Sequence, residues 1–329
     1  MGRRPMDNRG DKNMRKWLAL AATGVMALGV ISCGDDDSDS GGGGGTSGGG
    51  GNLSGNIRID GSSTVQPFAE AAAELFNEDN PDVRITVGGA GTGDGFEKFC
   101  RGETQISDAS RAIEPDEEKL CKSGKVTPTE VQVANDGITV VTNKELEVDC
   151  LTTAQLEKIF GKSAKATNLK DVDPKLPDSE LALYTPGTES GTFDFFTEQV
   201  NGEEGVQRTD GVQTSADDNV LVTGVSGEKG GLGYFGFSFY EQNQDKLNAV
   251  KIDGGGGCVE PSSETIQSGE YKPLSRPLFM YPSDKALKQP EVKAFLDYVT
   301  ENYQEIAEVA KIVPMSEEQA TKAKSALGG

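Results

Sequence analysis

Apolar and polar residues follow one another along this chain in short blocks that change from strand spacing to helix spacing. Residues 57–60 alternate as a strand does, and apolar residues then recur on one helix face from Phe68 to Phe76. Apolar runs at 84–87 and 181–184 are likewise followed by helical patterns. Repeated strand-to-helix units predict an α/β fold, in which ligands bind in the loops after the carboxyl ends of strands.

The rest of the pattern is consistent with this class. A strand is expected over 131–141, interrupted at 135–137, where Asp136 stands beside a glycine. Residues 168–179 and 201–217 read as loops, and Cys121 is also expected in a loop. The further elements expected are strands at 105–111, 232–240, 250–252 and 275–281, and helices at 151–160, 218–224, 290–313 and 316–327.

The junctions between strands and helices contain glycine, serine and threonine. In the clearest of them, 187–196, Ser190 is a good N-cap, and the first turn of the helix exposes N–H groups and the positive end of its dipole. Similar junctions lie at 61–65 and 88–95, and Arg111 ends a fourth segment. Each alone could be an ordinary capped turn or surface arginine. Together they favour an oxyanion-binding site.

Composition narrows the function further. The chain has 329 residues and a formal net charge of −21, which suggests about two domains and argues against nucleic acid as a partner. It contains no histidine, so Ser-His-Asp catalysis and the common histidine metal ligands are absent. We find no activated nucleophile, metal cluster or cofactor motif. A binding protein is therefore favoured over an enzyme.

The N-terminal part of the sequence is typical of export. A basic stretch precedes an apolar run from Trp17 to Ile31, and residues 1–32 are expected to be a signal peptide. The end of the run, Val30-Ile31-Ser32-Cys33, resembles the lipobox of bacterial lipoproteins. That resemblance implies cleavage before Cys33 and attachment of lipid, palmitate included, to its thiol. A plain secretory signal with an incidental cysteine is the alternative. The Gly-, Ser- and Asp-rich segment 33–55 is expected to be a tether.

From about Asn56 to the C-terminus, the chain resembles the periplasmic phosphate-binding proteins that feed the phosphate ABC transporter. Four segments carry the resemblance, in the family's order: Gly61-Ser62-Ser63-Thr64-Val65-Gln66-Pro67, Gly89-Ala90-Gly91-Thr92-Gly93, Asp108-Ala109-Ser110-Arg111 and Gly187-Thr188-Glu189-Ser190-Gly191-Thr192-Phe193. The resemblance implies the two-lobed, type II periplasmic-binding-protein fold, with phosphate in the cleft between the lobes. Lobe I would comprise 56–135 plus 275–329, and lobe II 136–274.

The resemblance also implies disulfides and ligands. After Cys33, four cysteines remain, and the implied pairs, Cys100 with Cys121 and Cys150 with Cys258, each stay within one lobe. The implied phosphate-binding residues are Ser63, Thr64, Val65, Thr92, Ser110, Arg111, Asp136, Ser190, Gly191 and Thr192.

Arg111 and Asp136 are assigned two particular roles in this set, the guanidinium and the proton acceptor. Many relatives carry an arginine just before the fourth segment, where this chain has Pro186, so the guanidinium role is assigned to Arg111. A carboxylate that accepts the proton of phosphate would reject sulfate, which has none. Asp136, Asp108 and Glu189 are the candidates, and Asp136 is favoured.

The function expected is high-affinity binding of inorganic phosphate at the extracytoplasmic face of a bacterial membrane and its delivery to the permease subunits of an ABC transporter. Three alternatives remain. The ligand could be sulfate, molybdate or tungstate, the chain could be a surface lipoprotein that does not transport, or it could be a phosphatase, which the missing catalytic groups make the weakest of the three.

Overall fold

The computed structural model describes residues 53–188 and 190–328, and the expected signal peptide, Cys33 and most of the expected tether lie outside them. The chain from Gly51 to Gly329 is one compact unit. Its strands are β1 Gly55–Gly61, β2 Val83–Val87, β3 Ile106–Ala109, β4 Val131–Asn143, β5 Cys150–Thr152, β6 Ala182–Pro186, β7 Val212–Ser215, β8 Gly231–Gly236, β9 Leu247–Ala249, β10 Lys251–Asp253, β11 Cys258–Val259 and β12 Ser275–Pro282.

Helices alternate with these strands, as an α/β fold requires. They are α1 Gln66–Asp79, α2 Thr92–Cys100, α3 Pro115–Gly124, α4 Thr153–Phe160, α5 Leu169–Val172, α6 Gly191–Asn201, α7 Asp218–Gly227, α8 Phe237–Glu241, α9 Ser263–Gln267, η1 Ala286–Lys288, α10 Pro290–Glu301, α11 Tyr303–Ala310 and α12 Glu317–Ala326.

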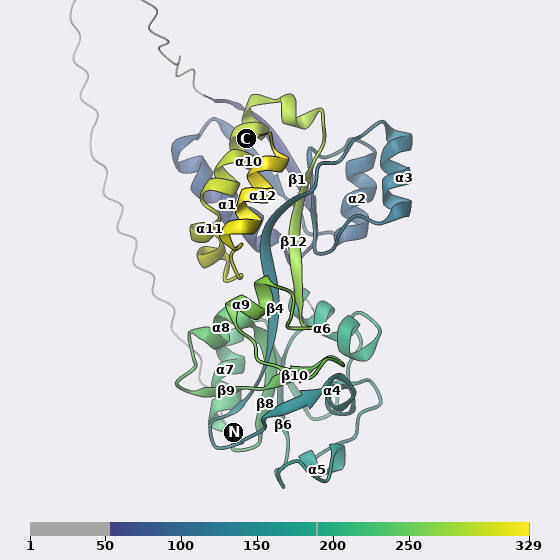
Figure 1. Cartoon of the computed structure of the whole chain (residues 1–329), viewed down its shortest axis with the longest axis vertical. Helices are drawn as coiled ribbons and strands as arrows, with labels where there is room; N and C mark the ends of the chain where they lie inside the picture. The colour runs from purple at the N-terminus through teal and green to yellow at the C-terminus, as the bar shows by residue number, and fades with distance from the viewer. Residues whose placement is uncertain (1–52, 189, 329) are drawn as a thin grey trace, which may run out of the picture. The chain divides into compact units, whose positions relative to one another are not determined.

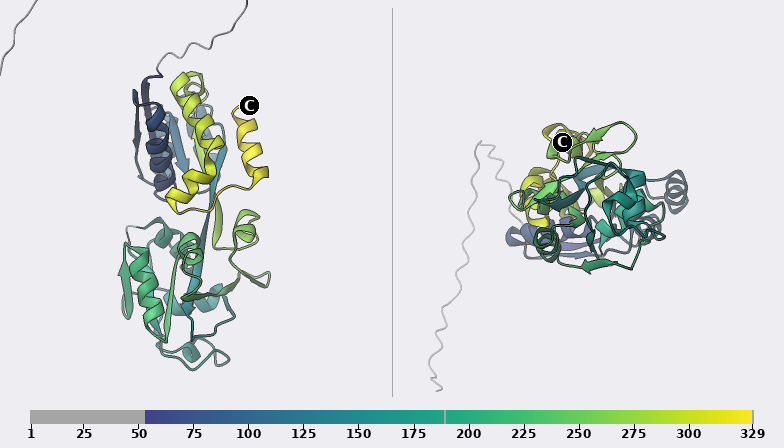
Figure 2. Two further views of the ribbon diagram at one scale, coloured as in Figure 1. Left: turned by 90° about the vertical axis from the view of Figure 1, so that its left-hand side faces the viewer. Right: turned by 90° about the horizontal axis from the view of Figure 1, so that it is seen from below.

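One mixed sheet runs through two packed cores. Its strand order is β2-β1-β3-β12-β4-β8-β6-β7, with β9 paired to β4, and β11, β10 and β5 form a small second sheet. The long strand β4 continues from one core into the other (Figures 1 and 2). The first core contains Val131, Ala134 and Leu278, and the second contains Ile138 and Leu274.

We call the parts around these cores lobe I and lobe II. In lobe I, α1, α10, α11 and α12 pack against one face of the sheet, and α2 and α3 cover the other (Figure 1). The expected boundaries at 135/136 and 274/275 stay a prediction. One residue of the C-terminal segment assigned to lobe I, Val313, packs in the core of lobe II and pairs with Asn135 through both backbone groups.

Several elements differ from the expectation. The strand over 131–141 is continuous through Asp136, because β12 pairs with that stretch. The helix expected over 290–313 is broken at Asn302, whose non-helical backbone follows α10 and whose Nδ2 donates to Tyr298 O. Cys121 lies in α3 rather than in a loop, since Pro115 and a Glu114–Glu117 capping box begin a helix there.

The segments expected to be loops also contain regular structure. Residues 168–179 include the single turn α5, which Asn168 caps by accepting the N–H of Lys170. Residues 201–217 include β7, which extends the sheet of lobe II beside β6.

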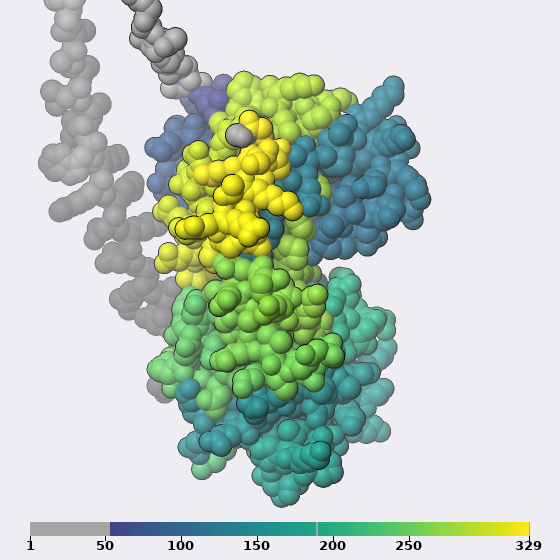
Figure 3. Space-filling model, in the orientation of Figure 1, coloured from purple at the N-terminus to yellow at the C-terminus, as the bar shows by residue number. Residues whose placement is uncertain are grey.

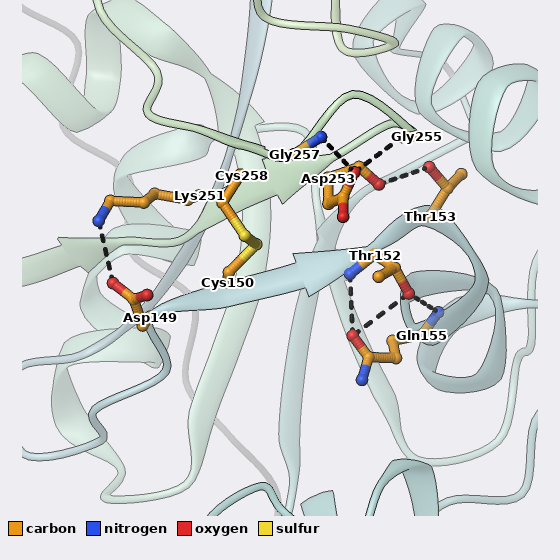
Figure 4. Close-up of a disulfide and its surroundings, with 10 residues drawn as sticks. All are labelled: Asp149, Cys150, Thr152, Thr153, Gln155, Lys251, Asp253, Gly255, Gly257 and Cys258. Carbon is orange, nitrogen blue, oxygen red and sulfur yellow. Dashed lines mark hydrogen bonds and ion pairs between the residues drawn. A yellow bond between two sulfur atoms is a disulfide. The ribbon is translucent and has the colours of Figure 1, made fainter.

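Two disulfides stabilise the lobes. Cys100–Cys121 joins α2 to α3, and Cys150–Cys258 joins β5 to β11 across the small sheet (Figure 4). These are the two pairs that the resemblance implied. Around the second bridge, Thr152 caps α4 by accepting the N–H of Gln155, and the Asp253 carboxylate accepts the N–H groups of Gly255 and Gly257.

Candidate functional site

A cavity of about 560 Å³ lies between the two lobes. In Figure 3, α2 and α3 of lobe I stand above α6 of lobe II at the right-hand edge of the molecule. The residues that line the cavity are Ser62, Ser63, Thr64, Ala90, Gly91, Thr92, Gly93, Asp94, Ser110 and Arg111 from lobe I, Gly191, Asp194, Phe195, Glu198, Gln199 and Glu204 from lobe II, and Pro273, Ser275 and Arg276 at the crossing strands.

The first predicted loop places hydroxyl groups at the cavity wall. It follows β1, and Ser62 folds it into the start of α1, because its carbonyl accepts the N–H groups of Val65 and Gln66. Ser63 and Thr64 line the cavity, as expected for ligands. Val65 does not, since its side chain is fully buried and its N–H donates to Ser62. The expectation that Val65 donates to the ligand therefore does not fit this geometry.

The second and third loops are joined to each other. The Thr92 hydroxyl lies 3.2 Å from the Ser110 hydroxyl and accepts the N–H of Ser110 at 3.3 Å. Asp60, at the end of β1, accepts a hydrogen bond from the N–H of Ala90 and forms an ion pair with Lys98. These two contacts hold the glycine-rich second loop against the first loop. Thr92 and Ser110 are thus held together at one wall of the cavity.

The fourth loop begins α6, as the sequence predicted. The Ser190 side chain caps the helix and accepts the N–H of Thr192, so that predicted N-cap is confirmed. Gly191 lines the cavity, whereas Ser190 and Thr192 support the turn behind it. A Cβ on Gly191 would lie 2.5 Å from Thr64 Oγ1, so only glycine lets the fourth loop approach the first so closely.

Arg276 is the buried arginine of the site, and the sequence reasoning missed it. It lies on β12, with a side chain 14% exposed, and its Nη2 donates to Thr64 Oγ1 at 2.8 Å. Its Nε pairs with Asp136 Oδ2 at 3.2 Å, and its guanidinium lies 3.7 Å from the centre of the Phe195 ring. Burial lowers the pKa of Arg276, and the Asp136 carboxylate opposes that shift. Arg276 therefore contacts the first loop of lobe I and helix α6 of lobe II.

Arg111, which was expected to supply the guanidinium, lines the cavity but is already paired. Its Nη1 and Nη2 each lie 2.9 Å from a carboxylate oxygen of Glu117, and Glu114 is 3.3 Å from its Nε. The hydrogen bond to Glu117 is the main reason that the pKa of Arg111 is raised. The assignment of the ligand guanidinium to Arg111 stays a prediction, and Arg276, which also lines the cavity and contacts Thr64, is a second candidate.

The expected proton acceptors also lie differently. Asp136 is bonded to Arg276 and does not line the cavity, and Asp108 is buried with burial raising its pKa well above the usual range. Glu189 lies outside the described residues. Asp194, which the sequence reasoning did not select, lines the cavity, and its carboxylate has no hydrogen-bond or ion-pair partner in the described chain. Burial raises the pKa of Asp194, and Glu204 adds to the shift.

Comparison with known proteins agrees with this architecture. Residues 46–302 match the family model described as a PBP superfamily domain. A phosphate-binding protein PstS of Staphylococcus saprophyticus is 42% identical over 276 residues, which is 83% of this chain and 84% of that protein. The crystal structure of a possible phosphate binding protein from Planctomyces limnophilus is 41% identical, with a TM-score of 0.79 over 84% of this chain and 98% of that one.

A third comparison includes a ligand. A proposed phosphate ABC transporter substrate-binding protein from Clostridium perfringens, solved with bound phosphate, is 30% identical, with a TM-score of 0.55 over 80% of this chain and all (100%) of that one. These matches define the class: the chain is a member of the PBP superfamily, built of two α/β lobes around a cleft. Within that class it belongs to the PstS family of phosphate-binding proteins.

Residues 53–188 and 190–328 lack two kinds of feature. None of the helices there combines the length and the apolar character needed to cross a membrane. Nor do three or more cysteine, aspartate or glutamate side chains gather in that part of the chain in a way that could hold a metal ion.

Proposed function

We propose that this chain binds inorganic phosphate in the cavity between its lobes and delivers it to the permease subunits of an ABC transporter. One observation carries the proposal: Ser63, Thr64, Thr92, Ser110 and Gly191 converge on a cavity that also contains the Arg276 guanidinium. Hydroxyl and backbone donors with one arginine suit a tetrahedral oxyanion. The family membership supports phosphate among these anions.

In this proposal Arg276 supplies the charge, and the start of α6 supplies N–H groups and its dipole. Gly191 stands at that start, with Ser190 and Thr192 beside it, so an oxygen of the ligand would meet the positive end of the helix. Arg276 is oriented by Asp136 before the ligand arrives, so little entropy is lost when it binds. The ligand would replace Thr64 or join it as a partner of Arg276 Nη2.

Asp194 gives the site its choice among oxyanions. Its unpaired carboxylate faces the cavity and can accept a hydrogen bond from the proton that phosphate keeps near neutral pH. Sulfate has no such proton, so its oxygens would face the half-buried Asp194 carboxylate with repulsion and leave an acceptor unsatisfied. The chain would act as a binding protein and not as an enzyme, with Cys33 lipid-anchored and the segment 33–55 serving as a tether at the outer face of a bacterial membrane.

Titration calorimetry on the purified full chain tests the proposal. Bound anions are first removed by unfolding and refolding, and phosphate is compared with sulfate and molybdate. Micromolar or tighter binding of phosphate with no sulfate response supports it. Tight binding of sulfate or molybdate would show that the proposed ligand is wrong and the proposed site is right. If a folded sample binds none of the three anions, the chain would instead be a surface protein that does not transport.

A further inference from the structure

The cavity contains charges that direct contact with an oxyanion does not explain. On the side of lobe II, Glu198 and Glu204 line it, and neither carboxylate has a hydrogen-bond or ion-pair partner among residues 53–188 and 190–328. On the side of lobe I, Arg111 lines it. Carboxylates that line an anion cavity repel the ligand. Both of them oppose the lowering of the pKa of Arg276 that burial causes, but Glu198 also acts on Arg111 of lobe I, and that relationship needs a separate explanation.

Arg111 is held in place from behind. Glu117 accepts two of its N–H groups at 2.9 Å each, and the carbonyl of Ala112 accepts another at 3.2 Å. The Glu117 carboxylate is itself fixed, because it also accepts the N–H of Glu114 in the capping box of α3 and is only 14% exposed. Arg111 is therefore an anchored cation at the cavity wall, and it remains 39% exposed.

Glu198 stands on the helix that carries the fourth loop. Gly191, Asp194, Phe195 and Glu198 all line the cavity, at the spacing of one face of α6 over two turns. The start of α6 at Gly191 already lies close to Thr64 of lobe I, so a closing movement about this contact would bring the later turn with Glu198 closer to lobe I. Glu198 already contributes to raising the pKa of Arg111, after Glu117 and Glu114.

We infer that Arg111 and Glu198 form an ion pair between the lobes when the cleft closes on its ligand, and that this pair slows release. The inference rests on the proposed function. It gives Arg111 a role in holding the lobes together instead of touching the oxyanion, and it gives Glu198 a reason to stand at an anion cavity. The groups that face Arg111 are Glu114 and Glu117 from lobe I and Glu198 from lobe II.

We call the proposed Arg111–Glu198 ion pair the latch. The direction in which Glu198→Gln changes the rate of phosphate release distinguishes the latch from a general effect of charge in the cavity. Removing a carboxylate from the cavity reduces repulsion, which by itself strengthens anion binding. Glu204→Gln, which removes the same charge from the same cavity, is the matched control and is expected to leave phosphate release unchanged or slower. Glu198→Gln is expected to speed release by about two- to fivefold, the effect of losing a partly exposed ion pair.

The experiment measures phosphate release by stopped flow on the full chain, for wild type, Glu198→Gln, Glu204→Gln, Arg111→Gln and the double variant Arg111→Gln/Glu198→Gln. The latch predicts that Glu198→Gln has no further effect once Arg111 is gone. Equal effects of the two glutamate variants, or a full effect of Glu198→Gln in the Arg111→Gln background, would overturn it. A wild-type chain that binds no phosphate would instead refute the proposed function, and the latch with it. Circular dichroism checks that each variant folds.

Discussion

Arg276 on β12 lies directly opposite Asp136 on β4, and their side chains form an ion pair with Nε and Oδ2 3.2 Å apart. Both strands run between the two packed cores at this point. Asp136 binds Nε of Arg276 and leaves Nη2 free to donate to Thr64 in lobe I. The flat face of the Arg276 guanidinium packs on the Phe195 ring in lobe II. The Arg276–Asp136 pair therefore fixes the orientation of a guanidinium that contacts both lobes.

The first prediction concerns Arg276. Arg276→Gln removes a charged hydrogen-bond donor from the site, and a bond of that kind contributes roughly 1.5–3 kcal/mol, so the phosphate Kd should rise about 10- to 100-fold. Calorimetry measures the change. The matched control is Arg111→Gln, whose guanidinium is paired with Glu117 and which should raise Kd by less than about fivefold. A larger loss in Arg111→Gln than in Arg276→Gln would restore Arg111 as the ligand.

The second prediction concerns the choice between anions. Asp194→Asn replaces an acceptor with a group that can also donate, so phosphate should bind about 10- to 100-fold more weakly and sulfate more tightly. Because the raised pKa of Asp194 lets it take up a proton as pH falls, wild-type phosphate affinity should decrease on acidification more steeply than that of the variant.

The control for this charge change is Asp94→Asn. Asp94 lines the same cavity from α2, and its replacement should not create sulfate binding. If Asp94→Asn and Asp194→Asn change the phosphate-to-sulfate ratio equally, the selectivity is a matter of net charge and Asp194 has no special role.

The third prediction tests the close approach of the lobes. Gly191→Ala would place a Cβ 2.5 Å from Thr64 Oγ1 and 3.1 Å from Thr64 N, so closure should be obstructed and phosphate affinity reduced at least tenfold. Gly93→Ala adds a methyl group to the same cavity where it would meet nothing within 4 Å, and should have little effect. Small-angle X-ray scattering with and without phosphate should show compaction for Gly93→Ala and not for Gly191→Ala.

The fourth prediction concerns pH and stability. Burial raises the pKa of Asp218, in the first turn of α7, from 3.8 to about 6. The folded state then holds this proton more tightly than the unfolded chain, so the contribution of Asp218 to stability is present below about pH 4 and is lost as pH rises to about 6. Asp218→Asn should remove up to about 3 kcal/mol of that dependence, seen in urea unfolding at pH 4 and pH 7.

Asp217→Asn is the reference for that measurement. Asp217 caps the same helix by accepting the N–H of Asn219, and asparagine can do the same. Asp217 also adds to the raised pKa of Asp218 through charge repulsion, so Asp217→Asn should reduce the pH dependence of stability only in part, and less than Asp218→Asn does. A pH dependence in Asp218→Asn that equals that of the wild type would show that Asp218 titrates normally.

The four loops of the site could be predicted because their signal is local. Each follows an apolar run with glycine, serine and threonine, and the chain folds there into a turn and the start of a helix. Ser63, Thr64, Thr92, Ser110 and Gly191 were found in this way, and all line the cavity. Val65 was also expected to donate, but the turn that starts α1 uses its N–H, which composition alone does not indicate.

Arg276 and Asp194 could not be found by the same reasoning. Arg276 reaches the site only because β12 pairs with β4 in one register, and Asp136, its partner, is 140 positions away in the sequence. The sequence does show Asp136 in the middle of a predicted strand, and Arg276 within the strand predicted at 275–281 is the opposite charge that could identify its partner. Asp194 is identified by the face that α6 presents to the cavity, and that depends on how the lobes pack.

The most direct test of this account is calorimetric titration of the ligand-free full chain with phosphate and with sulfate, for wild type and Arg276→Gln together. The account predicts micromolar or tighter phosphate binding by wild type, no heat from sulfate, and a phosphate Kd about 10- to 100-fold higher in the variant. Unchanged phosphate affinity in a folded Arg276→Gln, or no phosphate binding by the folded wild type, would contradict it.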